Sequence, residues 1–248
     1  MQPWQDQLRC FWHVKHGIDQ RKNMNHLFLL RHGENKANLT KEFSCKKIDY
    51  PLNEKGRLQA EQAGTHLLTQ NIKAIYCSPL KRAKETAAIV GRILHQPAII
   101  SETFREVNVG SLEDQPPSHE SWSHHNHILQ QWADGQAEVS FPGGESYRQL
   151  CERVQLGLQE ACDRFPNQNI LIVGHGGIFT LVLPCLCPEF SLHQILQVEN
   201  QNASLSEIQV RKDGQHLVGR LISWSNTEHL SGWAADLVSG LPNKHEFQ

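Results

Sequence analysis

Short continuous apolar runs alternate along this chain with longer segments whose apolar positions recur every three or four residues. The runs at 27–30, 74–77, 98–100 and 169–173 predict strands that are buried on both faces, because such strands lack polar alternation. Helical spacing follows in the segments listed here: 56–67, 83–94, 147–165 and 178–183. The β-α-β-α-β order of the first half predicts a parallel sheet with right-handed crossovers.

The alternation is interrupted in the middle of the chain and changes character near its end. Residues 102–141 contain Pro116-Pro117 and a polar stretch, which indicate an inserted cap with a short helix at 128–132. Apolar segments at 203–210 and 216–224 flank a turn signal and predict an antiparallel hairpin. We therefore expect one three-layer α/β/α domain with a mostly parallel sheet and an inserted cap.

The two ends of the chain lack these patterns. Residues 1–23 have neither helical nor strand periodicity and no apolar core of a signal peptide, so we expect a poorly ordered extension. Met24 stands directly before the first strand and is a candidate for the natural start. The domain is expected to cover 24–224, and the polar residues 225–248 to form a peripheral tail.

Composition excludes several classes of protein. The chain has 248 residues, a formal net charge of −2 and no basic run, which argues against a nucleic-acid-binding surface. No apolar run is long enough to span a membrane, and the glycine-rich fingerprints of nucleotide-binding loops are missing. A homodimer is compatible with this composition.

The cysteines favour a reducing compartment. There are seven, an odd number, and none forms a C-x-x-C motif, so we expect reduced thiols in a cytoplasmic protein. Cys77, Cys151 and Cys185 stand in apolar surroundings and are expected to pack as small hydrophobic residues.

Three predicted strands end in groups that bind anions. The first ends at Arg31 and His32, the second is followed by Arg82 one turn into a helix, and the fourth by His175 and Gly176 at a helix start. Carboxyl ends of parallel strands share one edge of the sheet, where ligands bind, and helix N-termini add N–H donors. The sequence therefore predicts a pocket for a dianion such as a phosphoryl group.

The candidate chemistry is attack by an imidazole. The chain shows no aspartate cluster for two metal ions and no C-x5-R loop, so His32 is the remaining nucleophile. Nearby positive charges keep an imidazole neutral and therefore nucleophilic. Glu106, after the third strand, is the candidate proton donor for the leaving oxygen, with Glu102, Glu113 and Asp114 as alternatives.

Other polar residues leave alternatives open. Asn38 and Ser78 fit either a phosphate contact or a turn or cap role. A histidine-rich stretch between His119 and His127 could bind zinc through His124 and His127, although solvated histidines are ordinary in a polar segment. We expect neither a metal nor a cofactor.

Five motifs occur in an order that is similar to that of the histidine phosphatase (phosphoglycerate mutase-like) superfamily, branch 1. They are Arg31-His32-Gly33-Glu34 with Asn38, Ser78-Pro79-Leu80-Lys81-Arg82-Ala83 followed by Thr86, Glu106 with Gly110, Pro142-Gly143-Gly144-Glu145-Ser146, and Val173-Gly174-His175-Gly176-Gly177. The resemblance covers residues 26–210 and implies this family's fold.

The resemblance also implies roles for the site residues. A phosphohistidine intermediate would form on His32, while Arg31, Arg82 and His175 hold the phosphoryl group. Asn38 would assist, and Glu106 would donate the proton. The implied substrate is a small phosphate ester, whose alcohol part stays open among sugar phosphates, nucleotides, α-ribazole phosphate and phosphoprotein.

Departures from the family pattern bear on the reaction. Cofactor-dependent mutases of this family typically read Glu-Arg-His-Tyr-Gly around the acid and Ala-His-Gly-Asn near the last histidine. This chain has Arg105-Glu106-Val107-Asn108 and Gly174-His175-Gly176-Gly177 instead, which favours a hydrolase. The alternatives are a phosphoglycerate mutase-type phosphotransferase and a catalytically idle module that binds a phosphorylated ligand.

Overall fold

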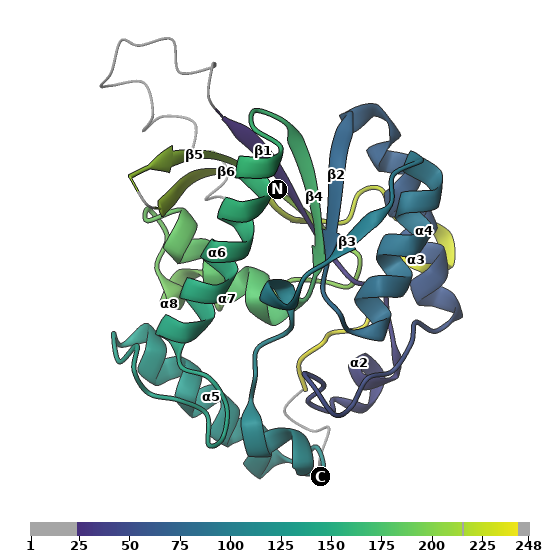
Figure 1. The fold of residues 1–248 in the computed structure, drawn as a ribbon. Coiled ribbons are helices and arrows are strands. Elements are labelled where there is room, and N and C mark those ends of the chain that lie inside the picture. The colour runs from purple at the N-terminus through teal and green to yellow at the C-terminus, as the bar shows by residue number, and fades with distance from the viewer. Residues whose placement is uncertain (1–23, 215, 243–248) are drawn as a thin grey trace.

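A six-stranded sheet forms the centre of the computed structural model, which describes residues 24–214 and 216–242 (Figure 1). Its strands are β1 (Asn25–Arg31), β2 (Ile72–Cys77), β3 (Ala98–Ile100), β4 (Asn169–Gly174), β5 (Leu205–Asp213) and β6 (His216–Asn226). The order is β3-β2-β4-β1-β5-β6, with β1 to β4 parallel and the β5–β6 hairpin antiparallel. The expectation for residues 1–23 lies outside the described residues.

The centre of strand β1, from Leu27 to Leu30, is continuously apolar because both of its faces are covered. Leu27 and Leu29 belong to the core beneath α6 (Tyr147–Arg164) and α7 (Gly176–Leu186). Phe28 and Leu30 belong to the core beneath the helices of the other layer, α3 (Glu54–Leu67) and α4 (Lys81–Leu94). Figure 1 shows these two layers on opposite sides of the sheet. The predicted three-layer fold is therefore confirmed.

Local signals in the sequence set most helix starts. Asn53 is the N-cap of α3, where its side chain accepts from the Gly56 N–H at 2.8 Å. Helix α4 begins at Lys81 with Leu80 as N-cap, slightly later than the predicted Ser78-Pro79 start. Within the described residues no helix is long and apolar enough to cross a membrane.

A close backbone crossing fixes the segment after β1 against α3. A Cβ atom on Gly33 would lie 2.2 Å from the Gly56 carbonyl oxygen, and one on Gly56 would lie 2.1 Å from the Glu34 carbonyl oxygen. Only glycine fits at either position. The conformation that follows the first strand thus depends on two glycines far apart in sequence.

The cap lies at the carboxyl end of the parallel strands, at the bottom of Figure 1. It holds η4 (Glu102–Phe104), η5 (Gly110–Asp114) and α5 (His119–Ala133), and α2 (Lys36–Thr40) lies at the same end. The predicted helix at 128–132 was too short. A capping box between Ser118 and Ser121 starts the helix earlier, and its histidines concealed the helical period from the sequence analysis.

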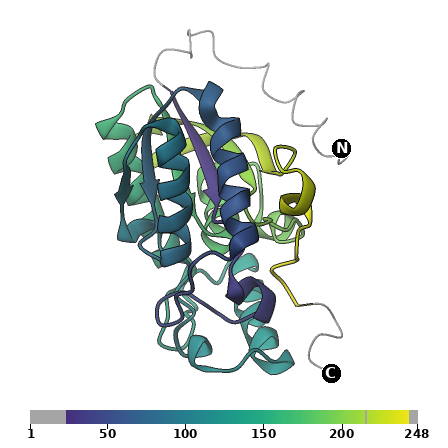
Figure 2. The ribbon, with the colours of Figure 1, turned by 90° about the vertical axis from the view of Figure 1, so that its right-hand side faces the viewer.

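The C-terminal segment differs from the expected peripheral tail. After β6 it forms η6 (Gly232–Ala235) beside α3 and then runs toward the cap (Figure 2). Its backbone carbonyls accept hydrogen bonds from long side chains: Gln59 donates to Ala234 at 3.1 Å, Lys55 to Asp236 at 2.8 Å and Lys41 to Ser239 at 2.6 Å. Composition alone gave no sign of these contacts.

The thiol prediction is wrong for two cysteines. Cys151 on α6 and Cys185 on α7 form a disulfide, with their Cα atoms 6.5 Å apart. Helices α6 and α7 pack against each other, and this tertiary contact brings together residues 34 positions apart in the chain. Cys77 is free and buried, as expected.

A buried ion pair between Lys55 of α3 and Glu34, which follows β1, allows a test of the fold. Lys55 and Glu34 are 7% and 3% exposed, with their charged groups 2.9 Å apart. Removing one partner of a buried pair leaves an uncompensated charge, so Lys55→Met should lower the unfolding free energy by about 3–5 kcal/mol in urea titrations. Glu34→Gln in the same chain should restore part of this loss.

The matched control breaks an exposed pair. Arg92 and Glu61 are 72% and 52% exposed and 3.8 Å apart, so Arg92→Met should change the unfolding free energy by less than about 1 kcal/mol. Equal effects of Lys55→Met and Arg92→Met would contradict the role given to the buried pair.

Candidate active site

The site lies where three neighbouring strands end. Strand β4 is paired with β1 on one side and β2 on the other, so the residues that follow these strands converge. His32 follows β1 and His175 follows β4, and their ring centroids lie 5.2 Å apart, edge to face. Arg82, from the first turn of α4, donates from Nε to Nε2 of His32 at 3.0 Å. The structure thus brings together the three predicted strand-end groups.

His32 is held as a neutral imidazole. It is 3% exposed, and its Nδ1 lies 2.7 Å from the Gly33 carbonyl oxygen. Because a carbonyl oxygen only accepts, Nδ1 carries the proton and Nε2 keeps its lone pair. Burial, followed by the charges of Arg82 and Arg31, holds the pKa of His32 well below its ordinary value.

Arg82 is oriented by a residue that no motif indicates. Its guanidinium donates to the Ser44 hydroxyl at 3.0 Å and to the Ser44 carbonyl at 2.6 Å. Burial lowers the pKa of Arg82 to about 10, so it stays cationic at neutral pH. Ser44 lies in the polar loop after α2, where the sequence carries no signal for this contact.

Arg31 is fixed from the opposite wall of the site. It is 8% exposed, and its Nη1 donates to the Asn200 carbonyl oxygen. Burial lowers the pKa of Arg31, while the carboxylates of Glu106 and Glu199 act in the opposite direction. A Cβ on Gly176 would lie 3.2 Å from Nε of Arg31, so the glycine gives this side chain its room.

His175 caps α7 and faces both arginines. It is fully buried, and its Nε2 forms a 2.7 Å hydrogen bond with the hydroxyl of Ser78, which therefore positions an imidazole. Its Nδ1 has no hydrogen-bond partner within the described part of the chain. Burial first, and then the charge of Arg82, holds the pKa of His175 well below its ordinary value.

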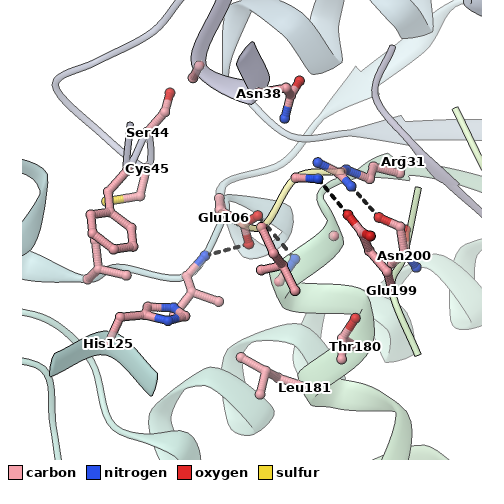
Figure 3. A pocket seen from close by; sticks show the side chains of 18 of the residues that line it. Arg31, Asn38, Ser44, Cys45, Glu106, His125, Thr180, Leu181, Glu199 and Asn200 are labelled. Carbon is pink, nitrogen blue, oxygen red and sulfur yellow. Dashed lines mark hydrogen bonds between the residues drawn. The ribbon is translucent and has the colours of Figure 1, made fainter. Parts of the chain in front are cut away.

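Asn38 lines the cavity at the start of the cap. Its Oδ1 accepts from the Asn35 N–H at 3.0 Å and from Nδ2 of Asn202 at 3.1 Å. Asn202 also donates to the His32 carbonyl at 3.2 Å. The amide group of Asn38 is thereby oriented, and its NH₂ end points toward the cavity (Figure 3).

Glu106 lies at the mouth of the site, against the start of α7. Its carboxylate accepts from the N–H groups of Val107 at 2.9 Å, Gly177 at 3.2 Å and Ile178 at 3.0 Å. Two of these amides belong to the helix start that was expected to bind the phosphoryl group directly. Glu106 therefore has a fixed position beside the anion-binding groups.

The alternative acids are engaged elsewhere. Glu113 accepts from four consecutive backbone N–H groups, those of residues 45–48, at 2.8–3.1 Å. Asp114 pairs with Lys47 and Glu102 with Arg105. None of these three carboxylates lines the cavity, so Glu106 is the one among the four predicted acids that does.

The histidine-rich stretch forms part of α5. His119, His124 and His127 are exposed, whereas His125 turns inward beside Phe43. Among the described residues, no group of three histidine, cysteine or acidic side chains is arranged to hold a metal ion. The zinc alternative therefore gains no support from the geometry.

One cavity of about 220 Å³ is bordered by Arg31, His32, Asn38, Arg82, Glu106 and Gly176, whereas His175 is not part of its described lining (Figure 3). The loop after α2 contributes Phe43 to its wall, the cap contributes Trp122 and His125, and the C-terminal segment contributes Gly240 and Leu241. These wall residues belong to no motif and were not predicted from the sequence.

Comparisons with known proteins agree with this geometry. Residues 27–222 match the family model described as histidine phosphatase superfamily (branch 1). The chain is 30% identical over 214 residues to a protein of Bacillus subtilis named "Uncharacterized phosphatase PhoE", covering 85% of this chain and 99% of that protein. It is 28% identical over 222 residues to a "Probable phosphoglycerate mutase GpmB" of Yersinia pestis, covering 86% and 98%.

A solved structure is also similar. "Bacillus stearothermophilus YhfR" superposes with a TM-score of 0.68 at 27% identity, covering 83% of this chain and 98% of that one. The similarity therefore extends over nearly the whole of each of these proteins.

The buried neutral imidazoles predict a loss of stability in acid. Below the ordinary pKa of 6.5, His32 and His175 bind protons in the unfolded chain but not in the folded one. The unfolding free energy should therefore be largest above pH 6.5 and fall as the pH decreases, by up to about 1.4 kcal/mol per pH unit for each residue. Urea titrations between pH 7.5 and 5.5 measure this slope.

Variants isolate the contribution of one imidazole. His175→Asn should flatten the slope, whereas His127→Asn, at an exposed position, should leave it unchanged. A slope that is the same in wild type and His175→Asn would refute this account of the acid sensitivity.

Proposed function

Because this chain belongs to the histidine phosphatase superfamily (branch 1), we propose that it hydrolyses phosphate monoesters through a phosphohistidine on His32, with Glu106 as general acid and base. The observation that carries this proposal is the 3.0 Å contact between Arg82 and Nε2 of a buried, neutral His32. The lone pair on Nε2 that would attack phosphorus therefore lies beside the guanidinium group that would bind the phosphoryl oxygens.

The first step transfers the phosphoryl group to the protein. Nε2 of His32 forms a bond to phosphorus while the bond from phosphorus to the ester oxygen breaks. Glu106 gives its proton to that oxygen, so a neutral alcohol leaves. Arg82 donates to Nε2 in the free protein, and a bound phosphoryl group offers it anionic acceptors instead.

The second step releases phosphate. The Glu106 carboxylate takes a proton from water, whose oxygen bonds to phosphorus as the nitrogen–phosphorus bond breaks. Arg31 and Arg82 stabilise the charge on the phosphoryl oxygens in both transition states. Asn38 borders the same cavity and supplies a further hydrogen bond. His175 lies edge to face with the ring of His32, and its unpartnered Nδ1 is the atom we propose to contact a phosphoryl oxygen.

Several expectations remain proposals. We propose a small-molecule phosphate ester as substrate and no requirement for a metal, a cofactor or nucleic acid. A cytoplasmic location and a homodimer stay predictions, and the Cys151–Cys185 disulfide weakens the thiol argument for the first.

Trapping the intermediate tests the nucleophile. The protein is mixed with ³²P-labelled phenyl phosphate and the reaction is quenched without acid. The protein should then carry the ³²P label, and later treatment with acid should release it. His32→Ala should abolish the label and lower turnover at least about 1,000-fold, while His127→Ala should alter neither. Label that persists on the His32→Ala protein would exclude His32 as the nucleophile. Label recovered on an added alcohol or phosphoglycerate, rather than as inorganic phosphate, would favour the phosphotransferase activity.

The leaving group tests the acid. An alkoxide needs a proton far more than 4-nitrophenolate does, so Glu106→Gln should slow hydrolysis of an alkyl phosphate by about 10²–10⁴-fold. With 4-nitrophenyl phosphate the variant should give a rapid burst followed by a slow steady state, because water attack still lacks its base. Glu102→Gln serves as the control, and equal losses on both esters without a burst would argue against Glu106.

A further inference from the structure

One part of the cavity lies beyond the groups that handle the phosphoryl transfer. Its wall is formed by Phe43, Trp122, His125, Leu129, Leu181 and Val198. In Figure 3, Glu106 lies between Arg31 and the side chains of His125 and Leu181. Since Glu106 faces the ester oxygen in the proposed mechanism, this wall is where the alcohol part of the substrate must lie.

The part of this wall that is formed by the cap and by the loop after α2 is an aromatic cluster. The ring centroids of Phe43 and Trp122 are 4.6 Å apart, and His125 lies 5.2 Å from Phe43 and stacks on Phe141 at 5.5 Å. Trp122 donates its indole N–H to the Lys41 carbonyl at 3.0 Å, so its polar atom is already paired. The cluster therefore offers the cavity ring surfaces rather than hydrogen-bonding groups.

His125 adds no charge to this wall. Burial lowers its pKa from 6.5 to about 4, in agreement with its position among aromatic rings. The rings of Phe43, Trp122 and Phe141 face it, and His124 precedes it on the same helix. At neutral pH the side chains of Phe43, Trp122, His125, Leu129, Leu181 and Val198 therefore carry no charge.

Within residues 24–214 and 216–242, the cationic side chains that line the cavity lie at the phosphoryl end. Among the described residues that line the cavity, Arg31 and Arg82 are the only lysine or arginine side chains, and both belong to the phosphoryl site. Lys41 directs its ammonium to the carbonyls of Asn38 and Ser239, at 3.0 and 2.6 Å.

The acidic side chains in the described part of the cavity wall are Glu42, Glu106 and Glu199. A second carboxylate on the substrate would thus be desolvated against an apolar wall, without a cation and with anions nearby. Esters that carry such a group are disfavoured by this geometry.

We infer that the alcohol part of the substrate is an apolar, ring-sized group without a second negative charge. This deepens the proposed function and rests on it. The cavity of about 220 Å³ is smaller than the roughly 300–1,000 Å³ of pockets for drug-sized ligands, which limits that group to about one or two rings. Its contact with the aromatic cluster, rather than a salt bridge, supplies the selectivity.

The test compares esters whose alcohols are all alkyl, so that leaving-group reactivity does not decide the result. The value of kcat/KM for 2-phenylethyl phosphate should exceed those for 3-phosphoglycerate and phosphoserine by about 10- to 100-fold, as expected from burying one ring. Release of inorganic phosphate measures all three.

Variants that insert a positive charge test whether this wall determines the substrate selectivity. Leu129 on α5 and Val198 before β5 are both half-buried, so each tolerates a longer side chain better than a core position would. Leu129→Arg and, separately, Val198→Arg should shift the preference toward 3-phosphoglycerate by about tenfold or more. Leu156→Arg, at a 61% exposed position on α6, should leave the preference as in wild type.

Failures of the two proposals are distinguishable. A wild-type protein that cleaves these esters but prefers 3-phosphoglycerate or phosphoserine would overturn the inference alone. So would an unchanged preference in both arginine variants, provided that 4-nitrophenyl phosphate shows them to be folded and active. Absence of hydrolysis with every ester, 4-nitrophenyl phosphate included, would overturn the proposed function together with the inference.

Discussion

Two buried guanidinium groups beside two neutral imidazoles form the constraint on which the rest of the site depends. Arg31 and Arg82 are removed from water, neither is hydrogen-bonded to a carboxylate in the described part of the chain, and burial lowers the pKa of both. Their hydrogen bonds go instead to neutral oxygens, from Asn200 and from Ser44. Such a site retains its positive charge for an anionic ligand, and it keeps His32 unprotonated and therefore nucleophilic.

The surrounding elements are arranged to keep this charge in place. The parallel strands bring the charged groups to one edge, while the loop after α2 and the segment before β5 supply the acceptors that orient the arginines. Helix α7 serves two purposes, because His175 caps its start and its first amides hold Glu106. The carboxyl group of Glu106, the proposed acid, is thereby held in place by backbone N–H donors rather than by the arginines.

The residues proposed for selectivity come from other elements than the residues proposed for the chemistry. The proposed phosphoryl end of the cavity is built on the sheet, whereas the proposed alcohol end is built from the cap, α7 and the C-terminal segment. Rings such as Trp122 and His125 in the cap can change without disturbing the strand ends. This division of labour is consistent with a superfamily whose members share a fold but bear different names and substrates.

The amino-acid sequence was sufficient to predict the layers of the fold and the groups at the strand ends. Buried strands such as β1 must be apolar on both faces, and Arg31, His32 and His175 stand at or directly after the ends of such strands, so spacing along the chain was sufficient. The partners of these groups and the residues of the cavity wall are visible only in the folded chain. Ser44, Asn200 and Leu241 act through contacts between segments far apart in sequence, which leave no periodic signal. The same holds for the Cys151–Cys185 disulfide and for α5, where tertiary packing of Trp122 outweighs a polar local sequence.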